Sequence, residues 1–549
     1  MLKIKSSLQN HYPLLISLLG GLAGAVIIMY ITRWGPWAHS DSVSYVEAAR
    51  NLATGGPLAE IRATGAIIPF DKQPPLYPWL LALGYKVGLS LTDSARIIDI
   101  TAFSLLVFSV GMLVARLSTR PWLPALAMLI ILTSPLLLEA SSGVMTEALF
   151  LMLSFVGLAL LAVYLIDGHH SLLVSSAIVI ALSTMTRYAG MVSIATGLTA
   201  IVVFHSGRIK TRIKLAAFFG LIAVFPLAIW LISRLAISSQ LASPQMHLAK
   251  IWQTLEPFRV KGVSIIWDWL PILGRFSHVA YRLKLEVEIL LGLTLLVVNL
   301  VRYFRPNRVL ASRPIRLAAL ILLFQAGFHL LFMAAVTILG PWEVRIDPRQ
   351  LTPEFLFGVL ALLLSLEFGT STRTRRWLSF SLQFIIVAAL LVQNFSETRV
   401  LINELHTSGR GYTARIWHDS ELLQAVESLP SDMVIISNDI EGLMYYTGIS
   451  AYRFTEIQEG IMMPINEPYG SRLDDPLQRL YAQDCAAIVL FENEPQPFQQ
   501  LYGEQANTRI HSIVSDSYQY SSSPQGGIYF KSEACADFQP TASQGCCSQ

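Results

Sequence analysis

The sequence predicts an α-helical polytopic membrane protein that carries a small α/β domain outside the membrane. Hydrophobic residues make up 53% of the 549 residues and charged residues 14%, with a mean hydropathy of +0.52, whereas a soluble chain is typically about one quarter charged. Apolar runs of membrane-spanning length recur as far as residue 395, and the composition then becomes polar. The net charge of +3 accompanies no Lys/Arg-rich tract joined to a nucleic-acid motif, so we expect no nucleic-acid partner.

The first apolar run, from Pro13 to Ile31, follows Lys3 and Lys5 as the core of a signal peptide would. Its length, however, matches the roughly 20 residues that cross a bilayer. The residues that close it, Tyr30 to Trp34, offer no small-residue cleavage site, so we expect a retained first helix. Further spans, about eleven in all with the first, are expected at residues 97–117, 122–138, 146–166, 172–187, 189–206, 213–234, 285–303, 316–339, 351–368 and 377–394.

Basic residues in the loops predict the orientation of these helices. Four basic groups fall on the same side of the membrane as Lys3 and Lys5, and the positive-inside rule makes that side cytoplasmic. The groups are Arg116 and Arg120; Arg208, Lys210, Arg212 and Lys214; Arg302, Arg305, Arg308, Arg313 and Arg316; and Arg373, Arg375 and Arg376. We therefore expect a multi-pass cytoplasmic (inner) membrane protein with its N-terminus in the cytoplasm and its C-terminal domain outside.

Two loops are expected on the outer side. Loop 32–96 contains the stretch WAHSDSVSYVEAAR, and loop 235–284 is broken by prolines and rich in aromatic residues, Trp267 and Trp269 among them. That aromatic density suits an interfacial, partly re-entrant segment, or ordinary anchoring at the lipid headgroups.

The chain is expected to divide into a membrane region at 1–395, an α/β domain at 396–533 and a disordered tail at 534–549. SELLQAVESLP and EGLMYYTG read as helices, the second ending at Gly448, while DMVIISN and CAAIVLFEN read as strands. RIHSIVSDSYQY and GGIYFK are candidate hairpin strands. All four cysteines lie here, and they either pair in an oxidising compartment or remain free thiols; they are Cys485, Cys535, Cys546 and Cys547.

Ionisable residues gather at the outer ends of the predicted helices. A charge near a helix centre costs about 2.5–3.5 kcal/mol on insertion scales, so such residues face protein or water. Basic residues on this side suggest an anionic partner, most simply a phosphate held by several cations; these residues are Lys72, Arg187, Arg345 and Arg349. The alternative is internal salt bridging with the neighbouring acids, which are Glu139, Glu147, Glu343 and Asp347.

Asp41 precedes a short amphipathic helix, SVSYVEAARNLATGG, that the two glycines stop. An acid there can simply cap the helix and complement its dipole, which stabilises by about 0.3–1 kcal/mol. Alternatively, its carboxylate serves the chemistry of an outer-face site. The residues alone leave both interpretations open.

Taken together, these stretches resemble the GT-C glycosyltransferases that use a polyprenyl-phosphate sugar. The closer likeness is to bacterial relatives of the protein O-mannosyltransferases and of the lipid A aminoarabinose transferase. The resemblance covers residues 10–395 and rests on four motifs. The first is an acid followed by a tyrosine and alanines, here DSVSYVEAARNL, and the second is a lysine–proline stretch, here DKQPPLYPWLLAL. The third is an acid that opens a later helix, here MTEALFLML, and the fourth is an Arg-x-x-x-Pro element, here RQLTP. The last lacks the Arg-Tyr of many relatives, and the WWDYG signature of oligosaccharyltransferases is absent.

The resemblance implies a GT-C-like fold and an inverting transfer of a sugar from a polyprenyl-phosphate carrier to an acceptor hydroxyl of a lipid, glycan or protein, on the extracytoplasmic face. Asp41 would be the catalytic base, and Glu147 would orient the acceptor or the sugar. Lys72, Arg345 and Arg349, with Arg187 less directly, would stabilise the leaving phosphate. Tyr45 would contact substrate, and Trp267 and Trp269 would cover the lipid tail.

No strong metal-ligand spacing occurs, so no cofactor is predicted, although a divalent cation is compatible with the site. The chief alternative function is a transporter or flippase for a lipid-linked or anionic substrate. A transporter would place polar residues near the bilayer midplane and repeat its halves, whereas here the charges cluster at one face and no repeat is visible. We expect the carboxylates and guanidinium groups to meet in one water-accessible pocket.

Overall fold

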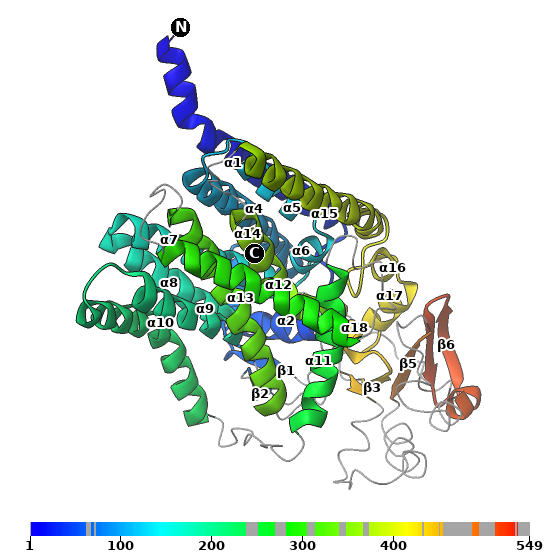
Figure 1. Cartoon of the computed structure of the whole chain (residues 1–549). Coiled ribbons are helices and arrows are strands. Elements are labelled where there is room, and N and C mark those ends of the chain that lie inside the picture. Colours follow the sequence, from blue (N-terminus) through cyan, green and yellow to red (C-terminus); the bar gives the residue numbers. More distant parts are fainter. Residues whose placement is uncertain are drawn as a thin grey trace. The chain divides into compact units, whose positions relative to one another are not determined.

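The computed structural model of the chain (Figure 1) describes residues 2–61, 67–70, 73–237, 251–269, 281–304, 313–339, 347–365, 373–430, 433–449, 451–453, 486–492, 511–532 and 535. Two compact units divide the chain. The helical unit comprises Met1–Pro36, Asp71–Leu80 and Thr92–Thr407, and the α/β unit comprises Trp37–Phe70, Leu81–Leu91 and Ser408–Gln549. Part of the first predicted outer loop therefore clusters with the C-terminal region, a division that differs from the expected ranges.

The helical unit consists of helices because an apolar segment in a bilayer has no water to satisfy its backbone, which must then bond to itself. Helix α3 (Leu76–Lys86) runs from this unit into the other. The remaining elements are α1 (Leu2–Ile31), α4 (Leu91–Leu117), α5 (Leu123–Leu132), α6 (Pro135–Ala140), α7 (Glu147–Asp167), α8 (His170–Thr186), η1 (Tyr188–Gly190), α9 (Met191–Phe204), α10 (Ile209–Ile237), α11 (Ile251–Asp268), α12 (Tyr281–Phe304), α13 (Arg313–Leu339), η5 (Pro348–Leu351), α14 (Thr352–Ser365) and α15 (Arg373–Thr407).

Each of the expected apolar runs overlaps helix in the described residues, but the run at 122–138 is divided. Ser134 caps α6 through its side chain and Pro135 occupies the first helical position, which ends α5. Five of the described helices are long and apolar enough to cross a membrane, which marks a multi-pass membrane protein: Tyr12–Ile31, Leu91–Leu117, Glu147–Asp167, Ile209–Arg234 and Arg313–Ile338. The full number of spans remains a prediction.

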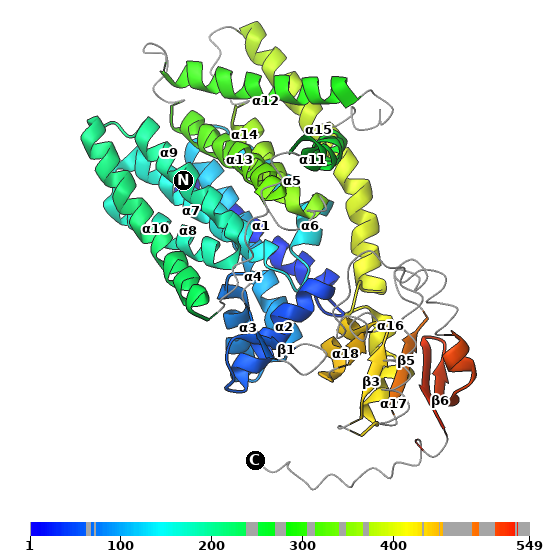
Figure 2. The same cartoon turned by 90° about the horizontal axis from the view of Figure 1, so that it is seen from below.

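Small residues and buried hydroxyl groups hold the helices together. The Ser154 and Ser183 hydroxyls lie 2.7 Å apart between α7 and α8, and the Ser176 hydroxyl donates to the Gly157 carbonyl at 2.7 Å. In lipid the tails are as apolar as the helix side chains, so no hydrophobic force drives helices together. They associate instead through close packing of small residues and through hydrogen bonds between polar side chains. Helix α13 packs on α14 and on α9, as Figure 2 shows for the first pair.

The end of α15 returns to the end of α1. The Tyr30 and His406 rings stack with centroids 3.8 Å apart, and the Trp34 indole donates to the His406 carbonyl at 3.1 Å. Figure 1 shows α15 running beside α1. These contacts fix the chain at the point where it leaves α1 towards the first predicted outer loop.

The α/β unit is built on a five-stranded sheet with strand order β4-β3-β5-β7-β6. Strand β3 pairs in parallel with β4 and β5, whereas β7 is antiparallel to β5 and β6. The elements of this C-terminal part are α16 (Arg415–His418), α17 (Glu421–Glu427), β3 (Ile435–Ser437), α18 (Ile440–Thr447), β4 (Tyr452–Arg453), β5 (Ala487–Phe491), β6 (Tyr518–Ser523) and β7 (Gly526–Phe530).

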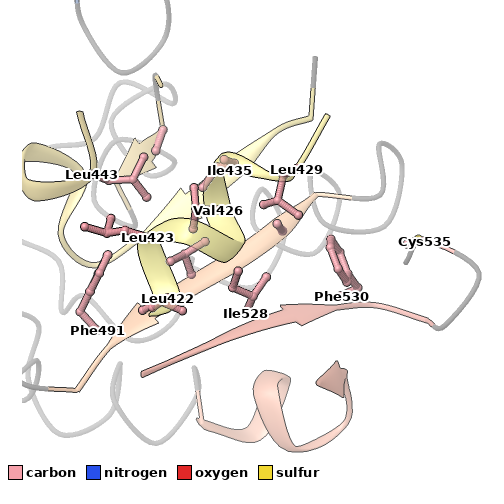
Figure 3. Packing of buried hydrophobic residues seen from close by; sticks show 13 residues of the cluster. Leu422, Leu423, Val426, Leu429, Ile435, Leu443, Phe491, Ile528, Phe530 and Cys535 are labelled. Carbon is pink, nitrogen blue, oxygen red and sulfur yellow. The ribbon is translucent and has the colours of Figure 1, made fainter. Parts of the chain in front are cut away.

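One face of the sheet is covered by α17 (Figure 3). Leu422, Leu423 and Val426 on this helix pack against Ile528 and Phe530 on β7 in one apolar cluster. Burial of this cluster removes apolar surface from water and holds the sheet together. Cys535 belongs to the same cluster and is disulfide-bonded; the other three cysteines and most of the predicted tail lie outside the described residues.

The first predicted outer loop contributes a helix and a hairpin to the α/β unit. Helix α2 (Ser40–Ala53) packs on the antiparallel pair β1 (Ala59–Ile61) and β2 (Ile67–Pro69), in which Glu60 faces Ile68. Helix α2 also packs on α18. Asp41 therefore stands on a helix that is fixed by residues more than 390 positions away in sequence.

Gly190, beside the predicted site residue Arg187, is required by packing. A Cβ here would lie 2.5 Å from the Thr184 Cα, which is backbone and cannot move aside. We expect Gly190→Ala to lower the free energy of unfolding by about 1–3 kcal/mol. Gly327→Ala, in the interior of α13 with nothing within 4 Å, should instead raise it by about 0.5–1 kcal/mol. Thermal unfolding of the purified variants in detergent measures both, and equal effects would contradict the argument.

Candidate functional site

Asp41 lies in the first turn of α2, but it does not cap the helix. The N-cap is His39, whose Nδ1 accepts a hydrogen bond from the Asp41 backbone N–H at 3.1 Å, and the Ser42 hydroxyl accepts one from the His39 N–H at 3.1 Å. Because His39 performs the capping that sequence reasoning allowed Asp41, the Asp41 carboxylate is released from that role. Its side chain is exposed and, within the described part of the chain, has no hydrogen-bond or ion-pair partner.

The buried face of α2 carries a second acid, Glu47, which is 2% exposed and forms an ion pair with Arg50 one turn along the helix. Burial raises the pKa of the Glu47 carboxyl; Arg50 acts in the opposite direction, and Glu60 adds a smaller increase. The ion pair therefore holds a charged group inside the fold, where an unpaired carboxylate would be costly.

Tyr45 is also buried, and its ring lies 6.1 Å from that of Phe70, at the end of the β1–β2 hairpin. The neighbouring Ser44 hydroxyl donates to Glu60 on β1 at 3.2 Å. These contacts favour a packing role for Tyr45, and its contact with substrate remains a prediction.

Glu147 and Arg187, in the helical unit, are brought together at the ends of two helices. Arg187 Nη1 lies 2.8 Å from Glu147 Oε1 and donates to the Thr146 hydroxyl at 3.0 Å. Glu147 opens α7, where a negative charge complements the helix dipole, and Arg187 caps the end of α8. Arg187 therefore forms a salt bridge with Glu147, which was the alternative to phosphate binding that the sequence left open.

Asp99 is fully buried in α4, and in the part of the chain that the structure describes neither of its carboxylate oxygens has a hydrogen-bond partner. Glu147, which interacts with it electrostatically, has the same charge and also leaves Oε2 without a partner. Buried polar atoms are normally satisfied, and an exception inside a membrane segment is by default a functional candidate.

Arg349 lies in η5, a short turn that leads into α14. The Asp347 carboxylate caps this turn: Oδ1 accepts from the Arg349 N–H at 2.9 Å, and Oδ2 accepts from its Nε at 3.3 Å. The Thr352 hydroxyl donates to the Arg349 carbonyl at 2.6 Å. The Asp347 carboxylate therefore orients this guanidinium group through a contact within the same turn, and η5 also packs beside α6.

Trp267 and Trp269 lie at the end of α11, within the second predicted outer loop. Trp267 is buried, with the Lys284 ammonium 5.7 Å from its ring, and Trp269 meets the Phe355 ring of α14 edge-on at 5.4 Å. The described part of this loop is helical rather than irregular. Both aromatic residues are therefore fixed against neighbouring helices, and their contact with a lipid tail remains a prediction.

Sequence reasoning missed a buried polar pair between α13 and α14. His329 Nδ1 lies 2.7 Å from Glu354 Oε1, and the two residues are 2% and 6% exposed. One turn earlier in α13, Gln325 accepts a hydrogen bond from Thr196 of α9 at 2.9 Å. A lone histidine in the apolar run QAGFHLLF and an acid directly after Pro353 were the available indications, because ionisable residues are rare in such segments.

The predicted site residues are thus distributed over both units. Asp41 and Tyr45 belong to the α/β unit, and the helical unit contains Glu147, Arg187, Arg349, Trp267 and Trp269. Lys72 and Arg345 lie outside the described residues. Among the residues that the structure describes, no group of three or more His, Cys, Asp or Glu side chains is placed to hold a metal ion.

Two comparisons place this geometry among known proteins. The dolichyl-phosphate-mannose-protein mannosyltransferase family matches residues 72–230. The structure resembles ArnT from Cupriavidus metallidurans bound to undecaprenyl phosphate, with a TM-score of 0.55 and 12% identity over 95% of this chain and 99% of that one. It also resembles the oligosaccharyltransferase AglB from Archaeoglobus fulgidus in complex with an inhibitory peptide and a dolichol-phosphate, with a TM-score of 0.52 and 10% identity over 97% and 75%.

The mycobacterial arabinofuranosyltransferase AftD gives a TM-score of 0.50 at 13% identity, over 93% of this chain and 41% of that one. No curated protein matches the sequence. At these identities the likeness to the solved structures concerns the fold alone. Together with the family match, it confirms the resemblance to the GT-C superfamily that the sequence motifs indicated.

The His329–Glu354 pair generates a stability prediction. His329→Leu should lower the free energy of unfolding by about 3–5 kcal/mol, because it leaves the Glu354 carboxylate buried without its partner. The double variant His329→Leu/Glu354→Leu should recover most of that loss, since no buried charge remains. Unfolding of the single and double variants in detergent tests this, and additive losses would refute the coupling.

The Glu47–Arg50 pair generates a pH prediction. In Arg50→Met the pKa of Glu47 rises further above its ordinary value of 4.5, because the opposing cation is gone. An acid whose pKa is raised in the folded state costs no stability while its carboxyl is protonated in both states. It destabilises the fold once the pH is high enough to ionise it in the unfolded state. The destabilisation relative to the unmodified protein should therefore be small below pH 4.5 and grow as the pH rises towards the folded-state pKa, by about 1.4 kcal/mol per pKa unit.

The control for this prediction is Arg50→Met/Glu47→Gln, in which position 47 no longer carries a carboxyl that titrates. Its stability relative to the unmodified protein should change far less with pH. Melting temperatures across the acid-to-neutral range decide the matter, and the same pH dependence in both variants would exclude Glu47 as its source.

Proposed function

We propose that this protein is an inverting glycosyltransferase that moves a sugar from a polyprenyl-phosphate carrier to an acceptor hydroxyl on the extracytoplasmic face of the membrane. The observation that carries the proposal is the exposed Asp41 carboxylate, which His39 relieves of capping and which has no hydrogen-bond or ion-pair partner among the described residues. The GT-C fold supports it, because ArnT, which shares that fold, binds undecaprenyl phosphate.

Asp41 acts as the catalytic base. Its carboxylate accepts the proton of the acceptor hydroxyl while that oxygen attacks the anomeric carbon of the donor sugar. The new bond joins the acceptor oxygen to the anomeric carbon. The bond from that carbon to the phosphate oxygen breaks, and its electron pair leaves with the polyprenyl phosphate. A single direct displacement of this kind inverts the anomeric configuration.

The leaving phosphate gains negative charge as the bond breaks, and fixed cations lower the barrier by stabilising that charge. Arg349 is suited to this role because Asp347 engages its backbone N–H and its Nε, which orients the guanidinium group. Lys72 and Arg345 are the other proposed ligands of the phosphate. Arg187, held by Glu147 and Thr146, acts less directly, by fixing Glu147.

Glu147 orients the acceptor or the sugar through its carboxylate. One of its oxygens is engaged by Arg187, and within the described residues the other has no hydrogen-bond partner. A carboxylate oxygen is a strong acceptor for a hydroxyl group of a sugar. Tyr45 is assigned to substrate binding, and Trp267 and Trp269 to the lipid tail, on the resemblance of their sequence context.

The disulfide-bonded Cys535 supports an extracytoplasmic C-terminal region, because disulfides persist in oxidising compartments and are rare in the cytosol. The basic loops support a cytoplasmic N-terminus, by the positive-inside rule. The acceptor accordingly lies outside the cell membrane or in its outer leaflet, where lipid, glycan and protein hydroxyl groups are all available.

Asp41→Asn should abolish transfer, because an amide cannot accept the hydroxyl proton as a base, while folding is preserved because the side chain is exposed. Loss of one general base typically costs about 10²–10⁴-fold in rate. The measurement is release of polyprenyl phosphate from a polyprenyl-phosphate sugar by the purified protein. The matched control is Ser40→Ala, an equally exposed position one residue earlier, which should keep its rate.

Full turnover by Asp41→Asn would remove Asp41 from the mechanism. If the unmodified protein instead moves the intact lipid-linked sugar across a vesicle membrane and releases no polyprenyl phosphate, the protein is a transporter or flippase and the proposal fails.

A further inference from the structure

Residues 408–448 hold both ends of the helix that carries Asp41. At the start of α2, Ala38 and Gly411 form an isolated parallel β-bridge, and the Tyr412 N–H donates to the Ala38 carbonyl at 2.8 Å. Ala38 immediately precedes the N-cap His39. The C-terminal region therefore fixes the backbone directly before the first turn of α2, where Asp41 lies.

This contact depends on glycine. Gly411 has a φ of +63°, and a Cβ at this position would lie 1.9 Å from the Ala38 carbonyl oxygen. An L-residue would encounter both the left-handed backbone strain and this clash with backbone atoms. The bridge cannot form with a side chain at position 411 unless one of the two segments moves.

Tyr412 extends the contact into the sheet. Its hydroxyl donates to Asp439 Oδ1 at 3.2 Å, and the same oxygen accepts the Gly442 N–H at 2.8 Å, which caps α18. Asp439 is buried and is the N-cap of α18, two residues after the end of β3. The start of α2 is thus linked through one tyrosine to a rigid strand–helix junction of the sheet.

The other end of α2 is held by α18. Arg50, the last basic residue of α2, approaches the C-terminal end of α18 so closely that a Cβ at Gly448 would lie 3.4 Å from its Nη1. A guanidinium group at a helix C-terminus complements the negative end of the dipole. The same group pairs with the buried Glu47. Arg50 therefore joins the buried face of α2 to the last turn of α18.

We propose that residues 408–448 are a positioning element for the transfer reaction, a two-point clamp that sets the direction of the Asp41 carboxylate. The inference rests on the proposed function of Asp41 and assigns the C-terminal region a part in turnover. It follows that the region acts on kcat through Asp41 rather than on binding of the lipid carrier. A misplacement of a catalytic group by about 1 Å is enough to cost about 100-fold in rate.

The first test compares Gly411→Ala with Gly55→Ala in the full-length protein. Gly55 also has a positive φ, of +95°, but a Cβ there meets nothing within 4 Å, so it reproduces the backbone strain without the clash. Hydrogen–deuterium exchange of peptides from residues 40–53 reports the clamp itself. We expect faster exchange in Gly411→Ala than in Gly55→Ala, with unchanged exchange in α7 and α13.

The second readout is steady-state transfer from a purified polyprenyl-phosphate sugar. Gly411→Ala should lower kcat by about 10- to 100-fold with the KM for the donor nearly unchanged. Arg50→Met/Glu47→Gln, which releases the other end of α2 without leaving a buried charge, should shift kcat in the same direction. This second variant decides the question if Gly411→Ala does not fold.

Unchanged exchange in α2 for both Gly411→Ala and the double variant overturns the clamp. A rise in the KM for the donor at constant kcat also overturns it, because the region would then serve carrier binding. If the variants show faster exchange in α2 but the unmodified protein transfers no sugar, the proposed function is refuted. The contact between residues 408–448 and α2 would still stand.

Discussion

The hydrogen bond from the Asp41 backbone N–H to the His39 imidazole determines what the Asp41 side chain is available to do. A helix start leaves several N–H groups without intrahelical partners, and a nearby aspartate is among the residues best suited to satisfy them. Here a histidine and Ser42 complete the cap between them. The carboxylate next to them stays exposed on a helix whose opposite face is buried, an arrangement that separates the structural task from the chemical one.

In the helical unit, too, separate side chains orient the residues that are assigned to the chemistry. Asp347 caps η5 and engages Arg349, and Thr146 and Glu147 engage Arg187, so each predicted phosphate ligand among the described residues is already oriented by an acid or hydroxyl. Preorganised charges of this kind need little rearrangement when a leaving group becomes negative. Asp99 is the contrasting case, since its carboxyl is buried without a hydrogen-bond partner among the described residues, beside Glu147 of the same sign.

Much of the helical architecture follows from the sequence because apolar length and loop charge are local quantities. The runs from Pro13 to Ile31 and from 146 to 166 coincide with α1 and α7 to within a few residues, apart from the longer start of α1. The helix ending at Gly448 and the strand in CAAIVLFEN were likewise visible as local patterns. The superfamily resemblance came from the order of four motifs rather than from any one of them.

What the sequence could not supply depends on contacts between distant segments. The bridge of Ala38 to Gly411, the approach of Arg50 to Gly448 and the pairing of His329 with Glu354 join residues that no periodicity relates. The sequence did not indicate that His39 caps α2, because this geometry exists only once the backbone of α2 is set. The division at 395 followed the end of the apolar composition, whereas α15 continues to Thr407.

The proposed reaction is a single displacement at the anomeric carbon with one carboxylate as base. Its most direct test is the anomeric configuration of the glycosylated product, measured by proton NMR for a donor of known configuration together with the amount of polyprenyl phosphate released. We expect an inverted configuration with one polyprenyl phosphate released per sugar transferred. A retained configuration would require either two successive displacements or attack from the face of the leaving group, and it would contradict a single direct displacement.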